Sequence, residues 1–216
     1  MSHPSPPPSP VADAGYANKM INSPIRLAAR AQLPSRYGDF QVVAFEHLGD
    51  SLDYGVMVRG DLEGAEAVPV RLHSECFTGD VMGSLKCDCR DQLEAALTYI
   101  GRQERGAVLY LPQEGRGIGL ANKIRAYSLQ DSGLDTVEAN LALGFPDDLR
   151  RYDVAAEILR QLGVRSVVLL TNNPNKSAGL AEHGIRVVGR VPLQVPANPH
   201  NARYLKTKRQ KSGHML

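Results

Sequence analysis

The sequence predicts an α/β fold of partly α+β character, with a mixed β-sheet, a β-rich first half and strand-helix units in the second half. Two observations carry this prediction. Up to about residue 77, runs rich in β-branched and aromatic residues alternate with Gly, Asp and Pro. Beyond residue 89, apolar residues recur at helical spacing between short apolar runs. With 216 residues, of which 43% are hydrophobic, the chain is long enough for one compact domain.

The expected elements follow in chain order. Alternating apolar residues predict strands, and apolar residues at helical spacing, such as Leu93, Ala96, Leu97 and Ile100, predict helices. The expected strands are 25–33, 40–48, 54–62, 67–77, 107–111, 166–170 and 185–193. The expected helices are 91–106, a helix from about Leu120, an amphipathic helix within 147–164, and a helix that begins near Lys176.

The two ends of the chain differ from the domain expected over residues 21–200. Residues 1–20 are rich in Pro, Ser and Ala, so we expect a disordered extension. Residues 201–216 form a basic, polar tail, which we expect to be solvated unless it contacts polyphosphate or a partner subunit.

Composition excludes several classes of protein. The net charge of +2 does not indicate a nucleic-acid or membrane partner. The sequence has no apolar run of about 18 residues and no signal-peptide core. Three cysteines with metal-ligand spacing argue against a disulfide framework and for a reducing interior. We therefore expect a soluble cytoplasmic protein.

All three cysteines lie in one short stretch. Cys76, Cys87 and Cys89 form a Cys-x10-Cys-x-Cys pattern, and a turn through residues 86–89 is needed to bring the sulfurs together. Three thiolates suit zinc, which takes four ligands in a structural site and keeps one position open in a catalytic site. His73 is the candidate fourth ligand of a closed site. The polar run Arg71, His73, Ser74 and Glu75 favours the open, catalytic alternative.

Charge adds a requirement to the catalytic alternative. Three thiolates around a dication leave a negative centre, which weakens the metal as a Lewis acid unless nearby cations compensate. Arg71, Lys86 and Arg90 are the cations that the sequence places near the cysteines.

Two further stretches suit anions. A turn with Gly115, Gly117 and Gly119 joins a strand to a helix but matches no familiar nucleotide fingerprint, so a tight connection is the simpler interpretation. Glu114 and Arg116 within this turn favour a functional role, because a turn needs neither charge. Lys176 in the first turn of a helix predicts an anion site. The charged cluster at 147–151 is typical of a solvated helix entry.

Seven motifs in order carry a resemblance to a known family. RLHSEC, SLKCDC, QEGRGIGL, NKIRAY, DTVEAN, LGF and LLTNNPNK occur on this one chain. The sequence thereby resembles GTP cyclohydrolase II of riboflavin biosynthesis from about residue 25 onward. It resembles the stand-alone form, without the dihydroxybutanone phosphate synthase domain often fused ahead of this enzyme.

The resemblance implies an activity. The family hydrolyses GTP and opens its imidazole ring, with release of formate from C8 and of pyrophosphate. The product is 2,5-diamino-6-hydroxy-4-(5-phosphoribosylamino)pyrimidine, formed in the first step of riboflavin biosynthesis. The resemblance also suggests a homodimer. Magnesium is expected with the triphosphate.

Residue by residue, the resemblance implies a set of roles. Cys76, Cys87 and Cys89 would bind the catalytic zinc, with water or substrate in the fourth position. Asp148 would be the proton acceptor, Arg150 the nucleophile toward the α-phosphorus, and Tyr127 the residue tied to completing ring opening. GTP would be bound by Arg71, Leu72, His73, Ser74, Glu75, Gln92, Glu114, Gly115, Arg116, Thr136, Thr171 and Lys176.

Physical chemistry refines three of these roles. Arg116 and Lys176 supply the charge that a triphosphate needs, and Glu114 or another carboxylate would accept hydrogen bonds from guanine. A guanidinium with a pKa above about 12 is a poor nucleophile, so a clamp on the α-phosphate is the simpler role for Arg150. With Tyr127 present, we expect full ring opening rather than a formylated end product.

Two alternatives belong to other classes. His73-Ser74-Glu75 reproduces the H-x-E of zinc nucleotide deaminases, but the Pro-Cys-x-x-Cys of that class is missing. A nucleic-acid binding module braced by a Cys3His zinc would use the basic tail and Arg116, although few Phe and no Trp are present for stacking.

Overall fold

The computed structural model describes residues 24–49, 52–211, 213 and 215, so the expectation for residues 1–20 lies outside the described part of the chain. Within these residues, seven strands form one mixed sheet in the order β1-β2-β3-β5-β4-β6-β7. This confirms the predicted fold class. The strands are β1 (Ile25–Ser35), β2 (Gly38–His47), β3 (Asp53–Arg59), β4 (Val68–Ser74), β5 (Gly106–Leu111), β6 (Ser166–Leu170) and β7 (Arg186–Val191).

The sheet has an antiparallel part and a parallel part. In the antiparallel part, β1 pairs with β2, β2 with β3, and β3 with β5. In the parallel part, β5 pairs with β4, β4 with β6, and β6 with β7. The α-helices are α1 (Cys89–Gly101), α2 (Gly119–Asp131), α3 (Thr136–Ala142), α4 (Asp153–Gln161), α5 (Pro174–Glu182) and α6 (Ala202–Lys211). The structure also contains a π-helical turn, η1 (Phe77–Val81), and a 3-10 turn, η2 (Glu114–Gly117).

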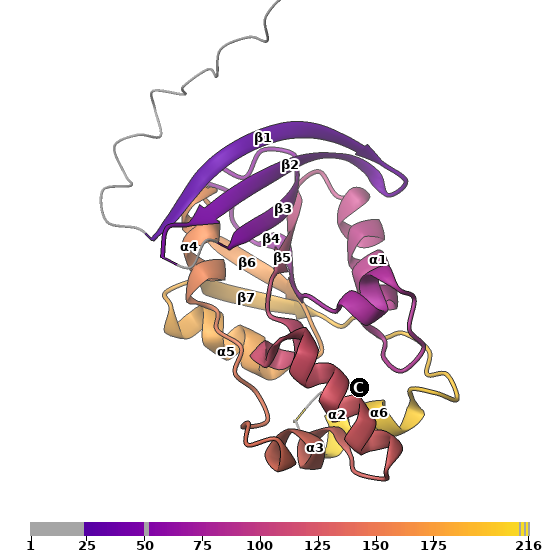
Figure 1. Ribbon diagram of the computed structural model, residues 1–216. Coiled ribbons are helices and arrows are strands. Elements are labelled where there is room, and N and C mark those ends of the chain that lie inside the picture. The colour runs from indigo at the N-terminus through magenta and orange to yellow at the C-terminus, as the bar shows by residue number, and fades with distance from the viewer. Residues whose placement is uncertain (1–23, 50–51, 212, 214, 216) are drawn as a thin grey trace, which may run out of the picture.

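Helices cover both faces of the parallel part (Figure 1). Helices α4 and α5 pack on one face and share the main core with buried residues of β4 such as Val70 and Leu72. Helix α1 packs on the other face through Ala96, Leu97 and Ile100. Because side chains alternate along a strand, Arg71 and His73 lie opposite Val70 and Leu72. They therefore point toward the α1 side, where Arg71 reaches Gln92 of α1.

The carboxyl ends of the parallel strands position the polar residues. β4 ends at Ser74, β5 at Leu111 and β6 at Leu170, and the functional motifs begin at or just after these residues. Ligands of open α/β sheets bind at this edge. Helices α2, α3 and α6 gather beyond it (Figure 1).

The helices of this lobe contain the main differences from expectation. The tail expected to be solvated forms α6, and Thr207 and Lys208 of that helix are buried. Helix α3 was not predicted; Asp135 caps it through a capping box with Glu138. Helix α4 begins at Asp153, so the charged cluster at 147–151 is a loop ahead of it. No helix of the described residues combines the length and hydropathy that a membrane span requires.

Candidate active site

One open cavity lies at the carboxyl edge of the parallel strands. Its volume is about 1080 Å³, solvent at its mouth included. Of the residues that the sequence predicts for substrate, metal and catalysis, all but Leu72 and Asp148 line it. Leu72 contributes its backbone oxygen, which accepts a 2.6 Å hydrogen bond from Lys176 Nζ. Asp148 contacts the cavity through Arg150.

The three cysteines form a cluster with the dimensions of a zinc site. Their Sγ atoms lie within 4.8 Å of one another, and those of Cys76 and Cys87 are 3.7 Å apart. Tetrahedral zinc with Zn–S bonds of about 2.3 Å separates sulfurs by roughly 3.8 Å. Gly79 of η1 makes room for the cluster, because a Cβ there would lie 2.8 Å from Cys87 Sγ and 3.1 Å from Cys76 Sγ. The donor set and the space therefore fit zinc.

The thiols are electrostatically unequal. Hydrogen bonds from Cys87 and Cys89 lower the pKa of Cys76, and the positive charge of Lys123 adds to this effect. The hydrogen bond to Cys76 raises the pKa of Cys87 to about 11. Cys76 is thus the sulfur that most readily carries negative charge.

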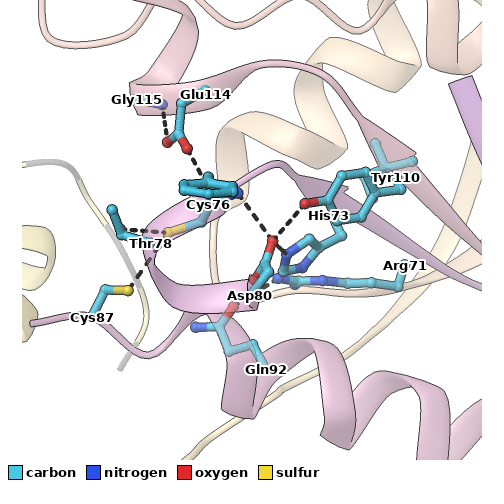
Figure 2. A network of polar contacts seen from close by, with 12 residues as sticks. Arg71, His73, Cys76, Thr78, Asp80, Cys87, Gln92, Tyr110, Glu114 and Gly115 are labelled. Atoms are coloured by element: carbon cyan, nitrogen blue, oxygen red, sulfur yellow. Dashed lines mark hydrogen bonds and ion pairs between the residues drawn. The ribbon is translucent and has the colours of Figure 1, made fainter. Parts of the chain in front are cut away.

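His73 lies outside the cysteine cluster. Its Nε2 is 2.9 Å from Asp80 Oδ2, the oxygen that also accepts hydrogen bonds from Cys76 N at 3.0 Å and from Tyr110 Oη at 2.9 Å. Figure 2 shows Asp80 at the centre of this network. Burial lowers the pKa of His73 despite the hydrogen bond with Asp80, so the ring is neutral at pH 7. The arrangement favours three thiolate ligands over a closed Cys3His set.

Arg71 and Gln92 connect the strand to helix α1. Arg71 Nη2 donates to Gln92 Oε1 at 2.7 Å, and Arg71 Nη1 donates to the backbone oxygen of Leu170 at 3.0 Å. Gln92 in turn donates to Asp88. Gln92 therefore points back toward the site from the first turn of α1.

Helix α6 reaches the same network from the other end of the chain. Lys208 Nζ donates to Asp88 Oδ1 at 3.0 Å, and both side chains are buried. Asp88 stands between the ligands Cys87 and Cys89, so α6 is tied directly to the cysteine turn. The sequence placed Lys208 in a solvated tail, and only its basic composition hinted at an anionic partner.

Glu114 holds the glycine-rich turn against η1. Its carboxylate accepts hydrogen bonds from Phe77 N and Gly115 N, both at 2.7 Å, and from Lys123 Nζ at 2.6 Å. Gly115 and Arg116 both have φ of 62°, in the left-handed region. For Arg116 this backbone is costly, and its guanidinium forms an ion pair with Asp147.

Asp148 and Arg150 form an ion pair in the loop before α4. Arg150 Nε donates to Asp148 Oδ1 at 2.8 Å, and Arg150 Nη2 donates to the other oxygen. Burial alone would raise the pKa of Asp148, but the bonds from Arg150 outweigh burial and lower it. Burial likewise disfavours the Arg150 cation, yet the bonds to Asp148 raise its pKa. Asp148 and Arg150 are therefore largely buried and paired, whereas Arg151 of the same cluster is exposed, as a solvated helix entry predicts.

Lys176 is buried at the start of α5. Asn173 caps this helix by accepting from Asn175 N, and Thr171 Oγ1 accepts from Asn173 N at 2.9 Å. Burial, reinforced by the charges of Arg71 and Arg150, lowers the pKa of Lys176 well below its ordinary value. The predicted cation is present, but below the surface rather than on an exposed helix end.

Tyr127 and Thr136 line the cavity from α2 and α3. Tyr127 Oη lies 3.3 Å from Thr78 Oγ1 in η1. Burial raises the pKa of Tyr127 to about 12, so its hydroxyl is protonated at neutral pH. The cavity thus holds a neutral donor beside the sulfurs.

Comparisons with known proteins agree over most of the chain. Residues 26–192 match the family model for GTP cyclohydrolase II. GTP cyclohydrolase-2 of Picrophilus torridus is 51% identical over 192 residues, which cover 89% of this chain and 100% of that protein. GTP cyclohydrolase-2 of Aeromonas hydrophila is 53% identical over 90% of this chain and 98% of that protein. RibBA of Bacillus cereus is 53% identical over 87% of this chain, which spans only 47% of that longer protein.

Proposed function

The chain belongs to the GTP cyclohydrolase II family of riboflavin biosynthesis, and from this premise we propose that it hydrolyses GTP with release of formate and pyrophosphate. The nucleotide product is 2,5-diamino-6-hydroxy-4-(5-phosphoribosylamino)pyrimidine. The sheet edge, the sulfur cluster and the cations of one cavity would each contact a different part of this substrate.

Two buried cations carry the proposal for a triphosphate. Arg71 and Lys176 are each 5% exposed, and among the described residues their hydrogen bonds go to an amide side chain and to backbone oxygens rather than to a carboxylate. A buried charge without an opposite charge is costly. An anionic ligand in the cavity would remove this cost.

Unpartnered polar atoms support a polar ligand beside these cations. Four buried atoms have no hydrogen-bond partner among the residues that the structure describes, and their residues all line the cavity: Arg71 Nε, His73 Nδ1, Ser74 Oγ and Asn173 Nδ2. Such atoms are rare in folded proteins and require a partner. We propose nucleotide contacts for Arg71, His73, Ser74, Glu75, Gln92, Gly115, Arg116, Thr136, Thr171 and Lys176, and a backbone role for Leu72.

Glu114 receives a different role from the guanine contact that the sequence suggested. Both of its oxygens already accept hydrogen bonds within the turn. Glu75 lines the same cavity, and burial together with the charge of Glu114 raises its pKa. We propose that Glu114 shapes the turn and that Glu75 accepts hydrogen bonds from guanine.

We propose that Cys76, Cys87 and Cys89 hold one catalytic zinc. Zinc bound by three protein ligands supplies a Lewis acid that activates water near neutral pH. Tyr127 and the polar end of β4 line the same cavity as the three cysteines and would lie near a metal held there. Magnesium is proposed with the pyrophosphate.

Asp148 and Arg150 act as a pair in this proposal. The raised pKa of Arg150 argues against a guanidinium nucleophile, so we assign Arg150 to clamping the α-phosphate. If Arg150 turns to the phosphate, Asp148 loses its cation and becomes a better proton acceptor. Trapping a phosphoramidate on Arg150 during pre-steady-state turnover would overturn the clamp.

Tyr127 is proposed to complete ring opening. Its protonated hydroxyl can donate to the formamide oxygen or nitrogen as the second bond is hydrolysed. Wild-type protein should release formate at every turnover, whereas Tyr127→Phe should accumulate a formylated nucleotide. A stable formylated product from the wild type would contradict this role.

The homodimer and the cytoplasmic location rest on the family and on composition. Light scattering of the purified full chain tests the first, and fractionation of cells tests the second.

The decisive experiment measures all products at once. Purified protein loaded with zinc is incubated with GTP and magnesium, and formate, pyrophosphate, ammonia and nucleotide are quantified. Equal amounts of formate and pyrophosphate without ammonia are expected. Ammonia release would favour a deaminase, and absence of turnover by folded, zinc-bound protein would favour a structural metal in a binding module.

A further inference from the structure

The charge of the cysteine cluster poses a problem that the proposed reaction does not solve. Three thiolates and one dication leave a net negative centre, and negative charge makes the metal a weaker Lewis acid. A cation close to one sulfur would offset this effect. The sequence offers Arg71, Lys86 and Arg90 as candidates.

The structure gives all three of these cations other partners. Arg71 feels the charge of Cys89, but its hydrogen bonds go to Gln92 and to the Leu170 backbone oxygen rather than to a sulfur. Lys86 pairs with Asp131 at 2.7 Å, with 45% of its side chain exposed. Arg90 pairs with Glu94 at 3.0 Å, with 48% of its side chain exposed. Exposed pairs contribute little to the field inside a cavity.

Lys123 of helix α2 contacts a sulfur instead. Its Nζ lies 3.1 Å from Cys76 Sγ, and the residue is 8% exposed. Nζ also lies 2.6 Å from Glu114 Oε1, and Glu114 accepts two backbone N–H groups besides. The positive end of the Lys123-Glu114 pair therefore faces the sulfur, and the carboxylate charge is shared among further donors.

The glycine-rich turn makes room for this lysine. A Cβ at Gly115 would lie 3.1 Å from Lys123 Cβ and 2.9 Å from Ile118 Cγ1. Gly115 thus lets the turn approach the stem of Lys123 closely. One helical turn further along α2, Tyr127 lies on the same face, with Lys123 Nζ 5.8 Å from the centre of its ring.

We propose that Lys123 is a positioning residue of the metal centre, an inference that rests on the proposed zinc site. Its ammonium holds Cys76 Sγ in one orientation by a charge-assisted hydrogen bond and draws negative charge away from the metal. Lys123 acts through the sulfur. Its removal should therefore lower kcat more than it raises KM for GTP.

Cobalt in place of zinc gives a readout that does not depend on activity. The full-length chain is loaded with Co²⁺, and the thiolate-to-cobalt charge-transfer band is recorded for wild type, Lys123→Met, Lys123→Arg and Arg125→Met. Arg125→Met is the matched control, because Arg125 lies on the same helix but is exposed and bonded to Asn122. A sulfur that loses its hydrogen bond and a neighbouring cation becomes a stronger donor, so the band of Lys123→Met should move to longer wavelength.

The companion variants make the outcome specific. Lys123→Arg restores the cation and should bring the band back toward the wild-type position, and Arg125→Met should match wild type. With zinc, Lys123→Met should lose roughly 10–100-fold in kcat, as expected for groups that support metal ligands. Lys123→Gln keeps a donor without the charge and should lie between wild type and Lys123→Met; it replaces the Met variant if that variant does not fold.

Two results are distinguishable. If wild type takes up cobalt and the bands of Lys123→Met and Lys123→Gln coincide with its own, Lys123 is not coupled to the sulfur and the inference is overturned while the zinc site stands. If wild type forms products but takes up neither cobalt nor zinc at the cysteines, the proposed zinc site fails and the inference fails with it.

Discussion

The two ends of the cavity differ in how their charges are balanced. At the sulfur end, Cys76 has the ammonium of Lys123 within 3.1 Å and Gly79 leaves space at the centre of the cluster. At the other end, Arg71 and Lys176 are buried and, among the described residues, bonded only to neutral groups. The sulfur end is arranged for a cation, and the arginine-lysine end is arranged for an anion.

If the cavity binds zinc and GTP as proposed, this difference in charge would keep their positions apart. The side chains at each end are held in position by backbone groups or by buried neighbours, so each end is preorganised for its ligand. Burial without a hydrogen-bonded carboxylate leaves the arginine-lysine end with an unfavourable energy, whereas Lys123 partly offsets the charge at the sulfur end. Binding relieves that energy, so substitutions at the two ends should have different consequences.

The largest effect is expected at the centre of the sulfur end. In Gly79→Ala, the new Cβ would lie 2.8 Å from Cys87 Sγ and 3.2 Å from Cys89 Cβ. The sulfurs cannot move aside and still hold one ion, so zinc should fall below one per chain and activity should fall by roughly 100-fold.

Metal analysis and turnover of the purified variant check this prediction. Gly55→Ala is the control, because a Cβ at Gly55 meets no atom within 4 Å. Full zinc content and near-normal activity in Gly79→Ala would mean that the cluster does not hold the metal in this geometry.

At the arginine-lysine end, Lys176→Met should separate binding from stability. Loss of the cation should raise KM for GTP by roughly 30-fold, which corresponds to about 2 kcal/mol. The free protein should become no less stable, because an uncompensated buried charge is removed. Steady-state kinetics and thermal unfolding without ligand measure the two effects. A lowered Tm with unchanged KM would assign Lys176 to the fold alone.

Lys208→Met tests whether α6 belongs to the cavity. Asp88 would keep Gln92 but lose its cation, so α6 should detach more readily and KM for GTP should rise by about tenfold. Hydrogen exchange of the α6 amides, compared with that of the exposed-residue variant Lys206→Met, measures the detachment. Equal exchange in both variants would show that the ion pair does not hold the helix.

The last prediction concerns the dependence of KM on pH. Burial and the charges of Arg71 and Arg150 lower the pKa of Lys176, so in the free enzyme its proton is lost at a lower pH than in the unfolded chain. The proposed contact with GTP requires protonated Lys176, so KM should rise as pH increases through this lowered pKa, by up to about tenfold per pH unit. In Lys176→Met this rise should be absent. The same rise in both proteins would assign it to another group.

Local sequence patterns were sufficient for most of the fold. The strands of the β-rich half and the helix after Cys89 follow from alternation and from helical spacing, and the structure confirms them. The family resemblance carried by the ordered motifs named residues that line the cavity, and the structure brings them together because β4, β5 and β6 end at one edge of the sheet.

Contacts between distant residues were not predictable in this way. Lys123 is a helix residue among several lysines, and its bond to Cys76 spans 47 positions. Asp80 lies in a short π-helical turn, which no periodic spacing of apolar residues predicts. Lys208 lies in a segment so polar that its sequence does not predict a buried helix face. The contacts of these three residues form only when the folded sheet brings distant segments of the chain together.

The Lys208-Asp88 bond also has a consequence for the order of events during synthesis. The cysteine turn leaves the ribosome 120 residues before its partner on α6. A nascent chain can therefore present all three thiols to the cell while the site is still open on the α6 side. If the three cysteines bind zinc as proposed, the metal could enter during this interval, and docking of α6 afterwards would close the turn from that side.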